Sequence, residues 1–238
     1  MAIYTIADTH LSLAVDKPMD IFGSRWENYL EKLTNGWNST VTDEDTVVIP
    51  GDISWAMNLQ DALEDFRFLD SLPGKKLLGK GNHDYWWTSL TRMKTFFEEN
   101  GISTLDFLYN NAYACEDINI CGCRGWYVDK NNSPKNIDYN KIVLREAARL
   151  ELSLSAADRL NEETGENREN VVFMHFPPLF INYKCEELLD VMHRHDVKLC
   201  FYGHIHGQYD LAQVTEEEGI EFVLISGDYL DFLPQRVN

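Results

Sequence analysis

Short apolar runs alternate with segments of helical periodicity along most of the chain, and this alternation restricts the fold more than any other feature. Apolar runs with the length of buried strands occur at residues 3–7, 46–50, 75–78, 118–121, 171–174 and 197–202. Between them, apolar residues recur every three or four positions, which is the spacing of one helix face. Strands that alternate with helices predict βαβ units and a sheet of largely parallel strands, so we expect the α/β class.

The helical segments and the remaining connections can be placed approximately. Helices are expected at residues 26–37, 59–66, 89–99 and 139–160. Two further apolar runs, residues 210–214 and 222–226, predict a hairpin and with it a second, more antiparallel sheet. Residues 124–138 show no periodicity and are expected to form a loop or lid.

Five of the expected strands are followed at once by residues that bind metals or carry protons. These residues are Asp8 and His10, Asp52, the trio Asn82, His83 and Asp84, His175, and the pair His204 and His206. The carboxyl ends of parallel strands meet along one edge of a sheet. We therefore expect these side chains to converge on one site, although they span most of the chain.

Three other candidates are interpreted as structural. Gly227-Asp228 also follows an apolar run, but a single Gly-Asp pair is usually an ordinary turn, and we interpret it as one. His193 and His195 lie near the end of a short expected helix, and residues two apart do not share a helix face. We expect both histidines to be structural or solvated.

The collected groups favour a metal centre over nucleophilic catalysis. No Ser or Cys stands beside a base, so a catalytic triad has no support. Imidazole and oxygen donors without thiolates suit Mn, Fe, Zn, Co or Ni. The donors are too many for one tetrahedral ion, but they suffice for two ions that share one carboxylate. With a bridging hydroxide such a centre carries a net charge of about +1 and holds an anion, for which a phosphate ester is the obvious class.

Composition limits the partners. The formal net charge of −18 opposes binding to nucleic acid or to anionic membranes. No apolar run approaches the length of a membrane span, and neither a signal peptide nor a C-x-x-C spacing is found. Five cysteines without a framework are typical of a reduced cytoplasmic protein. We expect a single domain over residues 1–238; the oligomeric state stays open.

The spaced motifs D-x-H, G-D, G-N-H-D, H and G-H-x-H, over residues 8–206, resemble those of the calcineurin-like metallophosphoesterase superfamily. The chain looks like a bacterial phosphohydrolase of that group, and its opening IADTHL resembles the cyclic-nucleotide phosphodiesterase branch. The resemblance implies a four-layer α/β-β/α sandwich of two mixed sheets flanked by helices. It also implies a dinuclear metal site at the carboxyl ends of the strands, with manganese or iron favoured.

The resemblance further implies a role for each motif residue. The first metal would be bound by Asp8, His10, Asp52 and His206. The second would be bound by Asp52, Asn82, His175 and His204, with Asp52 bridging the two. His83 would contact the phosphoryl oxygens and protonate the leaving group, while Asp84 would be structural.

Differences between this sequence and known branches of the superfamily reduce the number of possible activities. The protein Ser/Thr phosphatases of the superfamily carry G-D-x-V-D-R-G, whereas here Gly51-Asp52 is followed by Ile-Ser-Trp-Ala, which argues against a protein phosphatase. Arg124 is a candidate substrate contact. Tyr85, Trp86, Trp87 and Trp126 are candidates for stacking on a nucleobase, with core packing as the alternative.

Together these features predict a metal-dependent phosphohydrolase that cleaves a small phosphodiester or nucleotide. A metal-bridging hydroxide attacks phosphorus, and His83 acts as general acid. A phosphomonoesterase or a nuclease on the same site is the alternative. A non-enzymatic protein-interaction scaffold is disfavoured, because every ligand position and His83 are intact.

Overall fold

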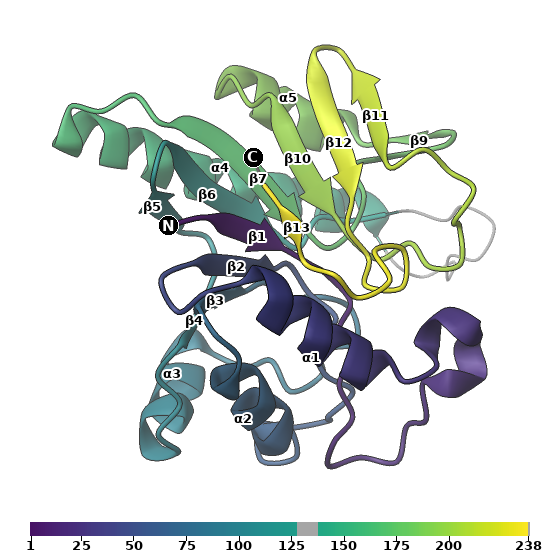
Figure 1. Cartoon of the computed structure of the whole chain (residues 1–238). Coiled ribbons are helices and arrows are strands. Elements are labelled where there is room, and N and C mark those ends of the chain that lie inside the picture. Colours follow the sequence, from purple (N-terminus) through teal and green to yellow (C-terminus); the bar gives the residue numbers. More distant parts are fainter. Residues whose placement is uncertain (128–137, 238) are drawn as a thin grey trace.

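Two mixed β-sheets lie face to face, with helices on the outer side of each (Figure 1). The structure is a computed structural model that describes residues 1–127 and 138–237. Helices α1, α2 and α3 cover the first sheet, whereas α4 and α5 cover the second (Figure 1). This arrangement confirms the expected four-layer sandwich. That residues 1–238 form a single domain stays a prediction.

The first sheet has the order β13-β1-β2-β3-β4. Its strands are β1 (Ile3–Thr5), β2 (Thr46–Ile49), β3 (Lys75–Leu78), β4 (Leu105–Phe107) and β13 (Gln235–Arg236). Strands β1 to β4 are parallel, and β13 is antiparallel to β1.

The second sheet has the order β11-β12-β10-β7-β6-β5. Its strands are β5 (Ala112–Cys115), β6 (Ile118–Cys123), β7 (Glu169–Met174), β10 (Leu199–Tyr202), β11 (Val214–Glu217) and β12 (Ile220–Leu224). The four central strands are parallel, and the edge strands β5 and β11 are antiparallel to their neighbours. A separate hairpin pairs β8 (Leu179–Phe180) with β9 (Tyr183–Lys184).

The α-helices follow the expected order. They are α1 (Tyr29–Thr40), α2 (Leu63–Ser71), α3 (Leu90–Glu99), α4 (Tyr139–Thr164) and α5 (Glu186–Arg194). The Ser89 hydroxyl accepts a hydrogen bond from the Arg92 amide at the start of α3. Gly101 follows the end of α3 with a φ of +70°, the left-handed conformation that helix ends favour.

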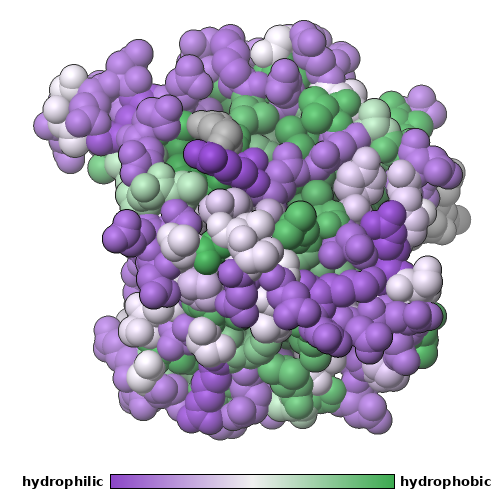
Figure 2. Space-filling view, in the orientation of Figure 1, coloured by the Kyte–Doolittle hydropathy of each residue, from purple (hydrophilic) through white to green (hydrophobic). Residues whose placement is uncertain are grey.

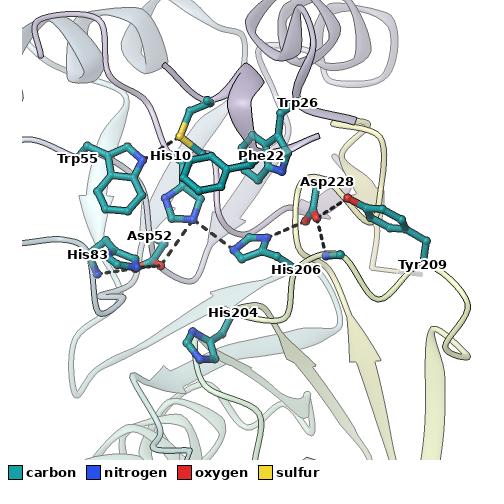
Figure 3. Close-up of a pocket in the computed structure, with 12 residues that line it drawn as sticks. His10, Phe22, Trp26, Asp52, Trp55, His83, His204, His206, Tyr209 and Asp228 are labelled. Atoms are coloured by element: carbon teal, nitrogen blue, oxygen red, sulfur yellow. Dashed lines mark hydrogen bonds and ion pairs between the residues drawn. The ribbon is translucent and has the colours of Figure 1, made fainter. Parts of the chain in front are cut away.

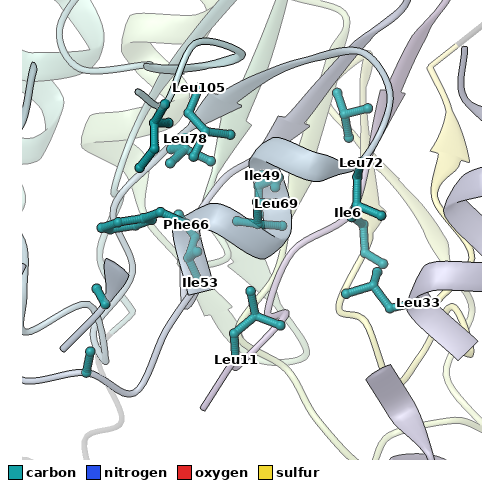
Figure 4. Close-up of a cluster of buried hydrophobic side chains, with 14 of the residues drawn as sticks. Ile6, Leu11, Leu33, Ile49, Ile53, Phe66, Leu69, Leu72, Leu78 and Leu105 are labelled. Carbon is teal, nitrogen blue, oxygen red and sulfur yellow. The ribbon is translucent and has the colours of Figure 1, made fainter. Parts of the chain in front are cut away.

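Apolar side chains fill three layers of core. Those of β2 alternate, because Val47 and Ile49 pack against the helices of the first sheet and Val48 faces the second sheet. Figure 4 shows the helix-side cluster, where Phe66 of α2 packs beside Ile49 and Leu78. Both faces of the central strands are therefore buried, which explains their continuous apolar runs. Hydrophilic residues dominate the face seen in Figure 2, with apolar residues in smaller patches.

Several sequence-based boundaries were wrong. The first helix begins at Tyr29, because Asn28 takes a left-handed φ of +54° and Trp26 lies in the short 3-10 helix η2 (Ser24–Trp26). Another 3-10 helix, η1 (Asp20–Phe22), precedes η2.

The C-terminal hairpin begins only at Val214, and the first residues expected in it are irregular. Strands β4, β5, β8, β9 and β13 were not anticipated, since each has only two to four residues and a weak pattern. The loop or lid expected at residues 124–138 lies largely outside the described residues. Within the described part of the chain, no helix is long and apolar enough to cross a membrane.

Candidate metal centre

The candidate residues come from strands of both sheets and meet at one edge of the sandwich. Asp8 and His10 follow β1, Asp52 follows β2, and Asn82 follows β3. His175 follows β7, and the pair His204 and His206 follows β10. A hydrogen bond links the two sheets here, because the amide of His204 donates to Asp8 Oδ2 at 2.8 Å. The structure therefore brings together all the residues that the sequence placed at strand ends.

The first group of donors is formed by Asp8, His10 and His206, whose ligand atoms lie within 4.8 Å of one another. The Nε2 atoms of His10 and His206 face each other at 3.3 Å. Asp8 Oδ1 lies 3.9 Å from Nε2 of His206. Two imidazole nitrogens and a carboxylate oxygen thus point at a common centre, which is an arrangement suited to a transition metal.

The second group is formed by Asp52, His175 and His204, also within 4.8 Å of one another. Asn82 joins this group, because its Oδ1 lies 2.6 Å from Nε2 of His175. The two groups adjoin, since Asp8 Oδ1 is 3.6 Å from Nδ1 of His175.

Asp52 lies between the two groups. Its Oδ2 atom is 3.7 Å from Nε2 of His10 and 3.5 Å from Nε2 of His175. Its Oδ1 atom accepts a hydrogen bond of 2.7 Å from the His83 amide. The position of Asp52 suits a carboxylate shared by two ions.

The electrostatics of these groups fit metal binding. Burial raises the pKa of Asp52 to about 9 and that of Asp8 to about 6. Burial also lowers the pKa of His204 to about 4 and that of His10 and His175 well below the ordinary value, which favours the neutral rings that metals bind. Among the described residues, Asp8 Oδ1 and the Nδ1 atoms of His10 and His175 are buried without a hydrogen-bond partner. A divalent cation stabilises ionised carboxylates and accepts neutral imidazoles, so this donor set fits one.

The backbone that carries the donors is strained. Four candidate ligands have positive φ: Asp8 (59°), His10 (44°), Asp52 (50°) and His204 (70°). Such conformations are uncommon in residues other than glycine and gather at functional sites. The glycines of the motifs pack closely against these residues. A Cβ atom on Gly203 would lie 2.5 Å from Asp8 Oδ2. A Cβ atom on Gly81 would clash with the Asp52 carboxylate. The glycines of the motifs therefore admit the neighbouring carboxylates.

His83 and Asp84 have different roles. The His83 ring packs at a tilt against Trp55, with 4.2 Å between centroids, and its Nε2 lies 4.0 Å from Asp52 Oδ2. Asp84 is buried and accepts hydrogen bonds from the amides of Gly81, Asp52, Ile53 and Ser54 and from Trp86 Nε1. It ties the loop after β2 to the loop after β3, a structural role in agreement with the sequence analysis.

Asp228 was wrongly interpreted as part of a plain turn. It is buried, and its Oδ1 lies 2.8 Å from His206 Nδ1. Its Oδ2 accepts hydrogen bonds from the Gly207 amide and the Tyr209 hydroxyl, both at 3.0 Å. Burial alone would raise the pKa of Asp228 and lower that of His206, but their hydrogen bond, their mutual attraction and the neighbouring polar and charged groups together outweigh it and shift both the other way. The sequence pattern that could have identified Asp228 is a Gly-Asp pair after an apolar strand, which is the same pattern that identified Asp52.

A cavity of about 290 Å³ opens beside the two donor groups (Figure 3). His10, Asp52, His83, His204 and His206 line one part of it. The other part is largely apolar and is formed by Met19, Phe22, Trp26, Trp55 and Tyr209. The described residues that line the cavity include no Lys or Arg.

The other candidates lie elsewhere. Arg124 approaches the buried Glu146 at 3.9 Å and packs on the rings of Trp126 and Phe176, and it is not among the described residues that line the cavity. Its contact with substrate stays a prediction. Trp86 is only 2% exposed and packs on Phe66. For this residue the structure therefore agrees with core packing, the alternative to stacking on a nucleobase.

Neither of the two remaining histidines lies among the candidate ligands. His195 contacts Asp158 and Glu151, and His193 contacts Glu218, in agreement with the expectation that both are structural or solvated.

The family model of the calcineurin-like phosphoesterases matches residues 1–208, a region that contains every candidate ligand. The chain belongs to this family. It is therefore a metal-dependent phosphoesterase, and its substrate is a phosphate ester. The family assignment agrees with the donor groups, because the matched region brings both of them to one edge of the sandwich.

Solved structures share the fold at low sequence identity. A protein of unknown function from Aquifex aeolicus, AQ665, is 17% identical with a TM-score of 0.52, over 99% of this chain and 95% of that one. The phosphopantetheinyl hydrolase PptH from Mycobacterium tuberculosis is 14% identical with a TM-score of 0.55, over the same shares of the two chains. No curated protein matches the sequence.

Proposed function

We propose that this phosphoesterase uses two metal ions to hydrolyse a small phosphodiester or nucleotide. The observation that carries the proposal is the position of Asp52 between two donor groups, with His83 beside it at the cavity. Asp8, His10, His206 and Asp52 would hold the first ion. Asp52, Asn82, His175 and His204 would hold the second. When bound, the ions supply a hydroxide nucleophile and neutralise charge on the phosphoryl group.

We propose manganese or iron as the bound ions, the preference that the resemblance to the superfamily implies, while the donor set itself suits Mn, Fe, Zn, Co and Ni. Each group mixes imidazole nitrogen with carboxylate or amide oxygen, and no thiolate is among the donors. Asn82 supplies a neutral oxygen, so the centre keeps more positive charge for an anionic substrate than a further carboxylate would leave.

His83 is the proposed general acid. Its amide donates to Asp52 Oδ1 at 2.7 Å, which fixes the backbone next to the shared carboxylate. Its ring packs against Trp55 at an interplanar angle of 45°, and 31% of its side chain is exposed. Burial lowers its pKa, and a bound phosphoryl anion would act in the opposite direction by favouring the charged ring. The ring can then donate its proton to the leaving oxygen.

The cavity favours a diester over a monoester. A diester carries one negative charge at phosphorus, whereas a monoester carries nearly two at neutral pH. The described lining residues offer no Lys or Arg to balance a second charge on the reacting group. The net charge of −18 disfavours nucleic acid, so a nuclease is less well supported. PptH is by name a phosphopantetheinyl hydrolase, which supports hydrolysis on this fold but does not identify the substrate.

A panel of substrates tests the proposal. Bis(p-nitrophenyl) phosphate and p-nitrophenyl phosphate are compared with the Mn²⁺-loaded protein, before and after treatment with a chelator. The proposal expects a higher kcat/KM for the diester, loss of activity with the chelator and recovery on adding Mn²⁺. A higher kcat/KM for the monoester would favour the phosphomonoesterase alternative, and no turnover of either would favour a scaffold.

We propose a cytoplasmic location from the five unpaired cysteines.

A further inference from the structure

Most of the apolar part of the cavity is built by a segment outside the strand ends that carry the candidate ligands. Met19, Phe22 and Trp26 come from the region of η1 and η2, between β1 and α1. Tyr209 completes this wall from the loop after His206. Figure 3 shows Phe22 and Trp26 on one side of the cavity and Tyr209 on another, with the histidines below them. Phe22 is 53% exposed although it is a large apolar side chain.

Exposed aromatic side chains beside a reactive centre suit a flat organic group. Trp55 and Trp26 are held by packing, because Trp55 stacks on His10 and Trp26 contacts Tyr29 and Phe232. Among the described residues no aromatic ring packs on Phe22, and its exposed side chain keeps a free face. An aromatic ring of a ligand that stacks on such a side chain gains about 1–3 kcal/mol, equivalent to about fivefold or more in affinity.

Lys17 adds a positive charge to this wall. Its Nζ lies 4.3 Å from the centre of the Trp55 ring and 5.8 Å from that of Phe22, and both rings line the cavity. Among the described residues, Lys17 forms no ion pair within 4.0 Å, although the chain has 39 acidic residues. On the opposite wall, Arg25 lies 4.8 Å from the centre of the Tyr209 ring. A cation that is held on cavity rings and left without a carboxylate is available to an anion of the ligand.

We propose that Phe22 and Lys17 form a specificity site for the organic part of the substrate. The inference rests on the proposed function, because the phosphoryl group must lie at the metal centre. The substrate class is then an ester whose organic part is a planar aromatic group with a second anionic group. The aromatic group lies against Phe22, and the second anion faces Lys17.

Calorimetric binding of phosphonates to the Mn²⁺-loaded protein tests this proposal without turnover. The probes are methylphosphonate, phenylphosphonate and 4-carboxyphenylphosphonate, each used as its monomethyl ester. Each probe then carries one negative charge at phosphorus, as a phosphodiester does, and the probes differ only in the organic group. Phenylphosphonate is expected to bind wild type about tenfold more tightly than methylphosphonate. The carboxyl group is expected to add about threefold or more through Lys17.

Two pairs of variants separate the contributions. Phe22→Ala is expected to lower the phenyl-to-methyl affinity ratio about threefold or more, and Ile21→Ala to leave it unchanged. Ile21 belongs to the same turn, is 69% exposed and is not among the described residues that line the cavity. Lys17→Gln is expected to abolish the gain from the carboxyl group. Its control is Lys75→Gln, because Lys75 lies 5.0 Å from the centre of the Tyr113 ring and begins β3, away from the strand ends of the site.

The failures are distinguishable. Binding of methylphosphonate with no preference for the phenyl group would overturn the inference and leave the proposed function standing. Equal losses in Phe22→Ala and Ile21→Ala, or a carboxyl group that weakens binding to wild type, would also overturn it. Binding of none of the three phosphonates would contradict the proposed function and the inference together.

Discussion

Nδ1 of His206 lies 2.8 Å from Oδ1 of the buried Asp228, while Nε2 of the same ring faces His10. The carboxylate fixes the orientation of the ring and keeps the proton on Nδ1, so that Nε2 is the atom free to bind a metal. Asp228 also holds the Gly207 amide and the Tyr209 hydroxyl, which links the first donor group to the wall of the cavity.

Asp228→Asn is expected to lower Mn²⁺ affinity by about 10–100-fold, because the amide neither fixes the ring as firmly nor raises its basicity. Competition with a chelator measures the affinity. Asp231→Asn is the control, since Asp231 is 56% exposed and pairs with Lys32 at the surface. Equal affinities in wild type and Asp228→Asn would show that the contact does not support the metal.

Asp84→Ala is expected to lower the free energy of unfolding by about 3 kcal/mol or more. Its carboxylate accepts hydrogen bonds from four backbone amides and Trp86 Nε1, and buried donors left without a partner are costly. Chemical denaturation measures the change, with Asp190→Ala, an exposed position of α5, expected within about 0.5 kcal/mol of wild type. A loss in Asp84→Ala no larger than in this control would contradict the structural role.

Gly203→Ala is expected to abolish high-affinity metal binding, because its Cβ would lie 2.5 Å from Asp8 Oδ2 and from the Cβ of Ala7. Gly165→Ala is the control. Gly165, unlike Gly203, has a left-handed φ, but no atom lies within 4 Å of its added Cβ, so only a modest loss of stability of about 1 kcal/mol is expected from the backbone strain. Metal content of the two folded variants measures the difference. Full metal binding by Gly203→Ala would show that the close approach is not required.

The contribution of Lys76 to the free energy of unfolding is expected to rise with pH between about 8 and 10.5. Burial lowers the pKa of Lys76 to about 8, and its Nζ donates to the carbonyls of Leu72 and Gly74. The unfolded state holds this proton up to a pKa of about 10.4, so across this interval it binds more protons than the folded state. The penalty of burying the charge is therefore present below pH 8 and is relieved as the pH rises. Denaturation of wild type and Lys76→Met measures the difference, and identical pH slopes would contradict the prediction.

The strand ends were the part of the site that could be predicted from sequence. Asp8, Asp52 and His175 each follow an apolar run, and parallel strands bring their carboxyl ends to one edge whatever the details of the loops. Their φ values and the close packing at Gly203 could not be predicted, because they depend on how the two sheets meet.

The wall of the cavity was not predicted, for a different reason. Phe22 and Tyr209 lie in segments without strand or α-helix periodicity, so their common position depends on tertiary packing. The same applies to Asp228, whose motif is common in turns, although it follows β12 in the same way that Asp52 follows β2. The sequence could therefore offer Asp228 as a Gly-Asp motif after a strand, but it could not tell this motif from an ordinary turn.

Manganese content per chain, measured for wild type, Asp52→Asn and His83→Ala beside turnover of bis(p-nitrophenyl) phosphate, tests the shared dinuclear centre most directly. Wild type is expected to hold two ions per chain and Asp52→Asn fewer, because the shared carboxylate is weakened. His83→Ala is expected to keep two ions and lose about 10²–10⁴-fold in kcat, because it lacks only the general acid. Fewer than two ions in reconstituted wild type, or loss of metal in His83→Ala, would contradict the arrangement proposed for Asp52 and His83.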